Sequence, residues 1–227
     1  MSLLPFKYKI DENVYLENNF KIDFQTSTHN FRQCIAILGA VGSGKSLLIK
    51  LLADSHLHEV GAYSQYPFCA YLSQDLTRLF TGNSIESILE IYQDKRYSVG
   101  QHFDKALFDE YAKRLKIDHL IEANRRLMHY SEGERQRLGI CLACAVRAKV
   151  TILDEPTTAL NLEHRLALYE IISEMKARTT VMIISHRFLD CLSVADHFIR
   201  MENLKVAEHF STEQIIDKEH ILNYYLG

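Results

Sequence analysis

A glycine-rich run at residues 39–46 has the composition of a phosphate-binding loop. It reads GAVGSGKS and fits the pattern G-x-x-x-x-G-K-[ST]. Glycines let the backbone curl so that successive N–H groups surround an anion, and a helix beginning near Lys45 adds its positive dipole end. Lys45 can reach the β- and γ-phosphates of a nucleotide, and the Ser46 hydroxyl can bind Mg²⁺. A plain turn between a strand and a helix is the less favoured interpretation.

A second stretch, VTILDEP at residues 150–156, supplies two adjacent carboxylates. Its apolar residues predict a buried strand, and Asp154 stands at the carboxyl end, where ligands bind in parallel sheets. Asp154 would hold a metal ion, directly or through water, and Glu155 can orient attacking water or accept its proton. Two acidic residues after a strand are typical of a solvated turn. Together with the phosphate loop, however, they indicate nucleotide hydrolysis.

The elements that must position these residues alternate between apolar runs and helical patterns. Strands are predicted at CIAIL (34–38), FCAYLSQ (68–74), KVTILDE (149–155) and TTVMIIS (179–185), with further short β-like runs within residues 6–24. Helices are predicted at KSLLIKLLAD, GERQRLGICLACAVRA and LEHRLALYEIISEMKA. This alternation indicates the α/β class, with a parallel sheet flanked by helices, and the phosphate loop indicates that it is a P-loop NTPase core.

Residues 83–129 have a different character, with many Leu, Ile, Glu, Lys and Arg residues. Leu107, Tyr111 and Leu115 are spaced by four residues and fall on one helix face. This segment predicts a helical lobe of two to four helices.

Composition narrows the class of protein. The 227 residues carry a formal net charge of −3, so there is no overall basic field, and nucleic acid is not expected as a partner. No apolar run approaches the roughly 18 residues needed to cross a bilayer, and the N-terminus lacks the long apolar core of a signal peptide. We therefore expect a cytoplasmic chain. The five scattered cysteines, Cys141 and Cys144 of a CxxC among them, are expected to be buried thiols.

Further stretches, in the right order along the chain, resemble the nucleotide-binding subunits of ABC transporters. YLSQD carries Gln74 where that family has its Q-loop glutamine, and YSEGERQRL at 130–138 lies where the family has its LSGGQ signature. TTALN follows Asp154 and Glu155 as the D-loop would, and IISHR ends with His186 at the position of the switch histidine. The resemblance extends over nearly the whole chain. It implies one ABC-type ATP-binding domain over 1–227, with a RecA-like core plus β-lobe (1–82 and 130–227) and a helical lobe (83–129).

The resemblance also implies a mechanism in which two such domains pack head to tail around two ATP molecules. Ser131 and the Gly133 backbone would contact the γ-phosphate bound by the partner chain, and His186 would hold the γ-phosphate of its own chain. Gln74 would sense the metal and water and connect the site to a membrane partner. An aromatic ring should stack on adenine; Tyr15 is the first choice and Tyr8 the second, with a strand core residue as the open alternative for Tyr15.

The implied site residues fall into three sets. Glu155, His186 and Gln74 are expected to act in catalysis, and Ser46, Gln74 and Asp154 to hold Mg²⁺. The ATP contacts are expected from Gly39, Ala40, Val41, Gly42, Ser43, Gly44, Lys45, Ser46, Leu47, Tyr15, Ser131 and Gly133.

The sequence departs from the family pattern at several positions. The signature reads YSEGE, so Glu132 and Glu134 place two carboxylates near a triphosphate, which should weaken the sandwich unless Arg135 or Arg137 compensates. The D-loop ends in Asn161 where aspartate is usual, and Ser46 is followed by leucine where a second hydroxyl residue is common. The stretch between the phosphate loop and the Q-loop is short, which predicts a reduced antiparallel β-lobe. Hydrolysis is still expected, because Lys45, Asp154, Glu155 and His186 are all present.

The sequence therefore predicts an ATPase subunit that powers a membrane transporter. GAVGSGKS, SQDLTRLFTGNSIESIL and SHRFLDCLSVADH are similar to the exporter branch, and YSEGERQRLG to the separate ATPases of polysaccharide exporters. The expected partners are a membrane-spanning subunit and a second ABC ATPase chain, identical or different, at the cytoplasmic face of the inner or plasma membrane. Two alternatives stay open: a soluble ABC-type ATPase outside transport, and a regulatory subunit that binds ATP with little turnover.

Overall fold

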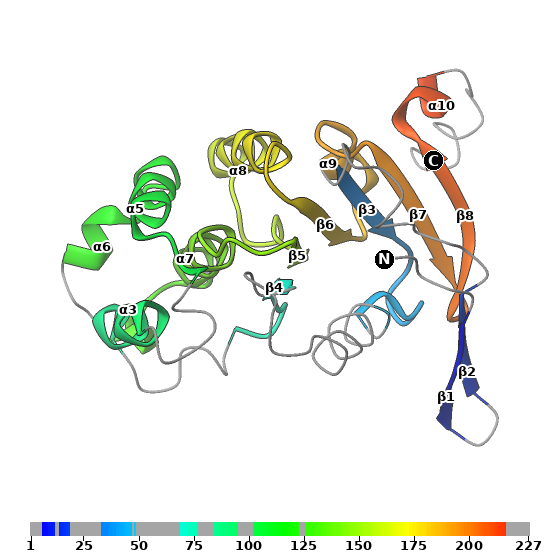
Figure 1. Ribbon diagram of the computed structural model, residues 1–227, viewed down its shortest axis with the longest axis horizontal. Coiled ribbons are helices and arrows are strands. Elements are labelled where there is room, and N and C mark those ends of the chain that lie inside the picture. The colour runs from blue at the N-terminus through cyan, green and yellow to red at the C-terminus, as the bar shows by residue number, and fades with distance from the viewer. Residues whose placement is uncertain are drawn as a thin grey trace.

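The computed structural model describes residues 6–11, 14–18, 33–46, 48, 69–76, 84–94, 102–122 and 126–216 (Figure 1). Within these residues the strands form one sheet in the order β1-β2-β8-β7-β3-β6-β5-β4. The strands are β1 (Phe6–Asp11), β2 (Val14–Asn18), β3 (Cys34–Leu38), β4 (Cys69–Leu72), β5 (Val150–Asp154), β6 (Thr180–Ser185), β7 (His197–Glu202) and β8 (Lys205–Ser211).

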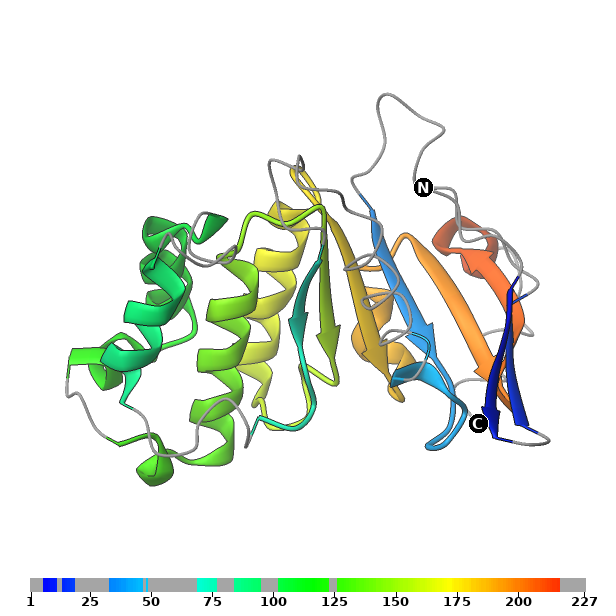
Figure 2. The same ribbon diagram turned by 60° about the horizontal axis from the view of Figure 1, so that its bottom comes forward.

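The described residues also form helices, some beside the sheet and others at the ends of the molecule (Figure 1). They are α3 (Ile85–Gln93), α5 (Lys105–Arg114), α6 (Asp118–Glu122), the short 3₁₀ helix η1 (Leu127–His129), α7 (Glu132–Cys144), α8 (Leu162–Met175), α9 (Phe188–Leu192) and α10 (Thr212–Ile216). Figure 2 shows α7 and α8 beside the strands β4, β5 and β6, which they contact. The predicted α/β class, with a parallel sheet flanked by helices, is confirmed.

Five neighbouring strands, β7, β3, β6, β5 and β4, run parallel to one another. Every residue of β3, β5 and β6 is buried, as expected for strands covered on both faces. Alternate residues serve opposite faces: Ala36 and Leu38 belong to the core under α7, α8 and α9, whereas Ile35 and Ile37 belong to a second core that includes Leu48. The sheet is therefore held rigidly from both sides at its centre.

The register brings the strand ends to one level. Because paired residues of parallel strands lie side by side, the residues that follow them emerge together at the carboxyl edge of the sheet. The pairs nearest this edge are Leu38 with Ser185, Asp154 with Ile184, and Leu72 with Leu153. Asp154 is the last residue of β5. The strand ends are followed within two residues by the phosphate loop, Glu155, His186 and Gln74.

The described part of residues 83–129 is helical, as the sequence predicts, and forms one end of the molecule opposite β1 and β2 (Figure 1). Ser84 caps α3 by accepting a hydrogen bond from the Ser87 N–H, and Asp104 caps α5 in the same way. The buried face of α5 is centred on Phe108, Tyr111 and Ala112. Leu115 is buried just past the helix end, and the expected Leu107 is only partly buried.

Two strands near the C-terminal end, β7 and β8, pair antiparallel and extend the sheet beyond β3. The turn between them contains Asn203 and Leu204, both with positive φ, 46° and 64°. Among the described residues no helix is long and apolar enough to cross a membrane.

Candidate nucleotide site

The phosphate loop leaves β3 and turns directly into a helix at Lys45 and Ser46. Gly39, Gly42 and Gly44 have φ values of 151°, 83° and 99°, a region that residues with a Cβ rarely adopt. A Cβ on Gly39 would also lie 2.4 Å from the Met201 carbonyl oxygen. The curled backbone that the pattern predicts is therefore present and requires glycine.

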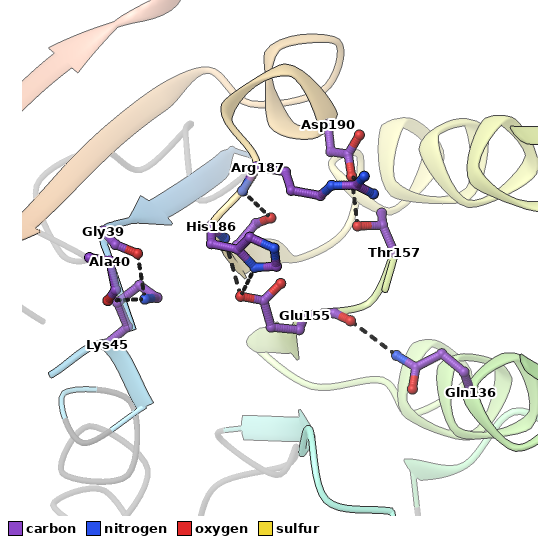
Figure 3. Close-up of polar contacts among 10 residues, drawn as sticks. Gly39, Ala40, Lys45, Gln136, Glu155, Thr157, His186, Arg187 and Asp190 are labelled. Atoms are coloured by element: carbon purple, nitrogen blue, oxygen red, sulfur yellow. Dashed lines mark hydrogen bonds and ion pairs between the residues drawn. The ribbon is translucent and has the colours of Figure 1, made fainter. Parts of the chain in front are cut away.

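Lys45 lies inside this loop and is 8% exposed. Its ammonium donates to the carbonyl oxygens of Gly39 (2.6 Å) and Ala40 (2.9 Å), as Figure 3 shows. Burial lowers the pKa of Lys45, and the carboxylates of Glu155 and Asp154 act in the opposite direction. A cation is thus held at the loop, near Asp154 at the end of β5 and Glu155, the residue after it.

Asp154 is buried at the end of β5, and its two oxygens differ in their partners. Oδ2 accepts a hydrogen bond from the Tyr71 hydroxyl at 3.1 Å, whereas Oδ1 is buried with no partner among the described residues. Burial raises the pKa of Asp154, and hydrogen bonds from Tyr71 and Ser46 lower it. A free carboxylate oxygen beside a serine hydroxyl is a donor set that suits Mg²⁺, which prefers oxygen ligands and keeps several waters.

Tyr71 was not predicted as a site residue. It lies in β4 next to the end of β5, and burial raises its pKa to about 12, so its hydroxyl stays protonated and can donate to Asp154. The one signal in the sequence was the alternation of FCAYLSQ, which places Tyr71 and Gln74 near the same strand end.

Glu155 and His186 meet at the edge of the sheet (Figure 3). Glu155 Oε1 accepts from the His186 backbone N–H at 3.1 Å and lies 2.9 Å from the ring Nδ1, while Oε2 is buried without a partner among the described residues. Glu155 has a φ of 49°, uncommon for a residue other than glycine, and Gln136 donates to its carbonyl at 3.3 Å. Strained backbone of this kind is concentrated at functional sites, so the two side chains are held in a defined geometry.

A cavity of about 250 Å³ opens beside this pair. Gly39 and Ala40 of the phosphate loop and His186 line it, together with residues of β7 such as Arg200. The phosphate loop and His186 therefore border one shared space, and His186 contacts Glu155.

The signature residues lie at the start of α7. Ser131 is the N-cap, and its hydroxyl and backbone N–H both donate to the Glu134 carboxylate, at 2.8 and 2.7 Å. Arg137 donates to carbonyl oxygens of Leu115 and Lys116, so part of its hydrogen-bonding capacity is used inside the chain. Gly133 lies close to the D-loop, since a Cβ there would come within 2.9 Å of the Ala159 carbonyl oxygen.

The other predicted residues are spread around the site. Gln74 is exposed just after β4, and Val41 projects from the phosphate loop with 95% of its surface exposed. Ser43 is buried, and its hydroxyl has no partner among the described residues. Tyr15 and Tyr8 have their backbones in β2 and β1, but their side chains and the whole of Leu47 lie outside the described part.

Comparison with known proteins agrees with this arrangement. The family described as "ABC transporter" matches residues 25–158. The ATP-dependent lipid A-core flippase of Haemophilus ducreyi is 30% identical over 202 residues, covering 81% of this chain and 34% of the flippase, so the chain spans about a third of that relative's length. The translation initiation factor rli1 of Schizosaccharomyces pombe is 25% identical over 198 residues, covering 86% of this chain and 30% of the factor.

Among solved structures, the dimeric post-hydrolysis state of an ATP-binding cassette bound to ADP and Pi aligns with a TM-score of 0.70. It is 16% identical and covers 92% of this chain and 96% of that one, which shows a shared fold. The family match covers more than half of the residues, and the cassette fold agrees with it. The chain therefore belongs to the ABC transporter family, as an ATPase domain that binds ATP.

Proposed function

We propose that this domain hydrolyses ATP with Glu155 and His186 and that the hydrolysis powers export through a membrane-spanning partner. The observation that carries the proposal is the contact of Glu155 Oε1 with His186, 2.9 Å from Nδ1, at the mouth of the phosphate loop. A carboxylate held beside a histidine at the edge of a phosphate-binding loop has the geometry needed to act on water near a terminal phosphate.

The phosphate loop supplies the binding energy. Its backbone N–H groups and the buried Lys45 ammonium would surround the β- and γ-phosphates, in place of the carbonyl oxygens that Lys45 now contacts. Burial lowers the pKa of Lys45, whereas Glu155 and Asp154 act in the opposite direction and favour its charged form. In this scheme residues 39–47 hold the nucleotide, and the adenine ring would stack on Tyr15.

Mg²⁺ would be held by Asp154 and Ser46, with Gln74 approaching from the Q-loop. When bound, the ion neutralises charge on the phosphate oxygens. The unpartnered Oδ1 of Asp154 supports this assignment, since a buried carboxylate oxygen without a donor is costly unless a ligand completes it.

Glu155 would orient the attacking water and accept its proton through the second oxygen, Oε2, which has no partner among the described residues. Oε1 is already engaged by His186, which would hold the γ-phosphate with the rest of its ring. In this scheme the two oxygens of Glu155 have separate roles, one toward water and one toward His186.

Two domains would assemble head to tail, with Ser131 and Gly133 completing the partner's ATP site. The dimeric post-hydrolysis cassette supports this assembly, and the lipid A-core flippase supports a membrane-spanning partner and a place at the cytoplasmic face of the membrane. The similarity to rli1 supports the alternative of an ABC ATPase outside transport. The partner that co-purifies from the native membrane decides between them.

The test measures ATP hydrolysis by the purified wild-type chain and by the Glu155→Gln variant. The variant should bind ATP but hydrolyse it about 10²- to 10⁴-fold more slowly, the usual contribution of a general base. Glu213→Gln, in the first turn of α10, removes an equal charge elsewhere and should not change the rate. Hydrolysis by Glu155→Gln at the wild-type rate would exclude Glu155 as the base. ATP binding without turnover in the wild type would favour the regulatory alternative.

A further inference from the structure

A mostly buried carboxylate, Asp190, joins the two loops that carry Glu155 and His186. Asp190 lies in α9, four residues after His186, and its side chain is 12% exposed. The Thr157 hydroxyl donates to Oδ2 at 2.8 Å, and Arg165 Nη1 donates to Oδ1 at 3.2 Å. Arg187 Nη1 lies 3.6 Å from Oδ2. Figure 3 shows Thr157, Arg187 and Asp190 grouped beside the Glu155–His186 contact.

These contacts form a second link between the segments that carry Glu155 and His186. Glu155 contacts His186, and Thr157, two residues after Glu155, contacts Asp190, four residues after His186. Two short segments that leave neighbouring strands are thus tied to each other twice. A shift of either segment relative to the other would therefore strain both contacts.

We propose that Asp190 is a positioning residue for ATP hydrolysis, which fixes His186 and Glu155 through Thr157 and Arg187. The inference rests on the function proposed above. The partners of Asp190 lie on α8, at the N-cap of α9 and in the loop after β5, and none of these contacts involves the phosphate loop. Its loss should therefore affect turnover and leave the binding of ATP unchanged.

The hydrogen bond between Thr157 and Asp190 is strengthened by the charge of the carboxylate and by burial. A hydrogen bond from a hydroxyl to an ionised carboxylate is stronger than a neutral one, particularly away from water. Thr157 is 3% exposed and Arg165 approaches from the other side, so Asp190 has donors on both oxygens. Burial raises the pKa of the neighbouring Tyr169, and the carboxylate of Asp190 raises it further. Asp190 is thus enclosed by donors on α8 and on the loop after β5.

The experiment measures kcat and KM for ATP in Asp190→Ala, Thr157→Val and Thr157→Ser. A misplacement of about 1 Å can lower a rate about 100-fold, so Asp190→Ala and Thr157→Val should each lower kcat about 10- to 100-fold with KM within about twofold of wild type. Thr157→Ser keeps the hydroxyl and should retain most of the activity. The control is Leu189→Ala, a neighbour on α9 that is 58% exposed.

Thermal unfolding and the imidazole NMR signals of His186 are recorded on the same variants. The signals should shift in Asp190→Ala and Thr157→Val but not in Leu189→Ala. An unchanged kcat in Asp190→Ala, or equal losses in Thr157→Val and Thr157→Ser, would overturn the inference. If the wild type hydrolyses no ATP, the proposed function fails, and the positioning role is then decided by whether the His186 signals move.

Discussion

The Ser131 hydroxyl donates a hydrogen bond to the Glu134 carboxylate one turn further along the same helix, with 2.8 Å between the oxygens. The backbone N–H of Ser131 donates to the same carboxylate oxygen at 2.7 Å, and these bonds lower the pKa of Glu134. A negative charge therefore already occupies the first turn of α7, the end of the helix that favours anions. In the proposed dimer the partner's γ-phosphate must arrive at this place.

Replacing both signature carboxylates should strengthen ATP-dependent dimerisation. Glu132→Gly with Glu134→Gln removes two negative charges from the turn that would face the triphosphate, where like charges repel strongly once water is excluded. The measurement is sedimentation in ATP, with Glu155→Gln present in every sample to prevent turnover. The control removes two charges from α8, as Glu170→Gln with Glu174→Gln. Tight dimers with the natural signature, or no gain after the double change, would contradict this account.

Lys45→Ala should abolish tight ATP binding while the fold is retained. The β- and γ-phosphates would lose their cation, and the two carbonyl oxygens that Lys45 now contacts lie in an open loop where water can replace it. Calorimetry gives the ATP affinity, and a thermal melt of the same sample shows whether the chain is folded. Lys205→Ala is the matched control, because it also removes one positive charge but from an exposed residue of β8. An unchanged affinity in Lys45→Ala would rule out the phosphate-loop assignment.

Tyr71→Phe should raise the Mg²⁺ concentration that is needed for hydrolysis. The Tyr71 hydroxyl holds Asp154 Oδ2, and loss of a partner behind a metal ligand commonly lowers metal affinity about 10- to 100-fold. The variant also lacks a hydrogen bond that lowers the pKa of Asp154. ATPase activity is titrated with Mg²⁺ at fixed ATP, beside Tyr92→Phe as a control in the helical lobe. Superimposable titrations of the wild type and Tyr71→Phe would remove Tyr71 from the site.

Asp104 should stabilise the helical lobe in a pH-dependent way. It caps α5 and pairs with Arg147 at 2.6 Å, and the hydrogen bond from Arg147 is the largest cause of its lowered pKa. A lowered folded-state pKa means that the stabilisation is present above the unfolded pKa and is lost as the pH falls through the folded one. Asp104→Ala should therefore cost about 1 kcal/mol near pH 7, typical of a lost cap, and less in acid.

Urea unfolding at several pH values measures the effect of Asp104→Ala. Asp104→Asn serves as the control, because its side chain can still cap the helix but cannot pair with Arg147 as an ion. A free-energy difference that does not shrink in acid would show that the carboxylate charge is not involved.

Much of the candidate site could be predicted from the sequence because its parts are local. The phosphate loop and the Asp154–Glu155 pair each depend on a short run that follows one buried strand, and the structure brings those runs to one edge. The S-x-x-E spacing of Ser131 and Glu134 is also a local signal, since it is the pattern of a capping box. The resemblance assigned Ser131 to nucleotide, and the contact within its own helix was not predicted.

Contacts between side chains on strands or helices that are distant in sequence could not be predicted from the sequence. The Tyr71–Asp154 bond depends on β4 lying next to β5, and the Thr157–Asp190 bond depends on how α9 packs against the loop after β5. The β7–β8 hairpin was missed for a different reason. Its turn uses positive φ at Asn203 and Leu204 without glycine, so the usual turn signal is largely absent.

The register of β3, β5 and β6 has a consequence for how this chain tolerates change in length. Side chains alternate between the two faces of a strand, so a one-residue deletion inside β6 would turn every later side chain of that strand to the opposite face. The contact between His186 and Glu155 would then be lost, although no residue of the site had been replaced. Insertions beyond α9 leave that spacing intact. Natural relatives and engineered variants should therefore differ in length outside these strands and almost never within them.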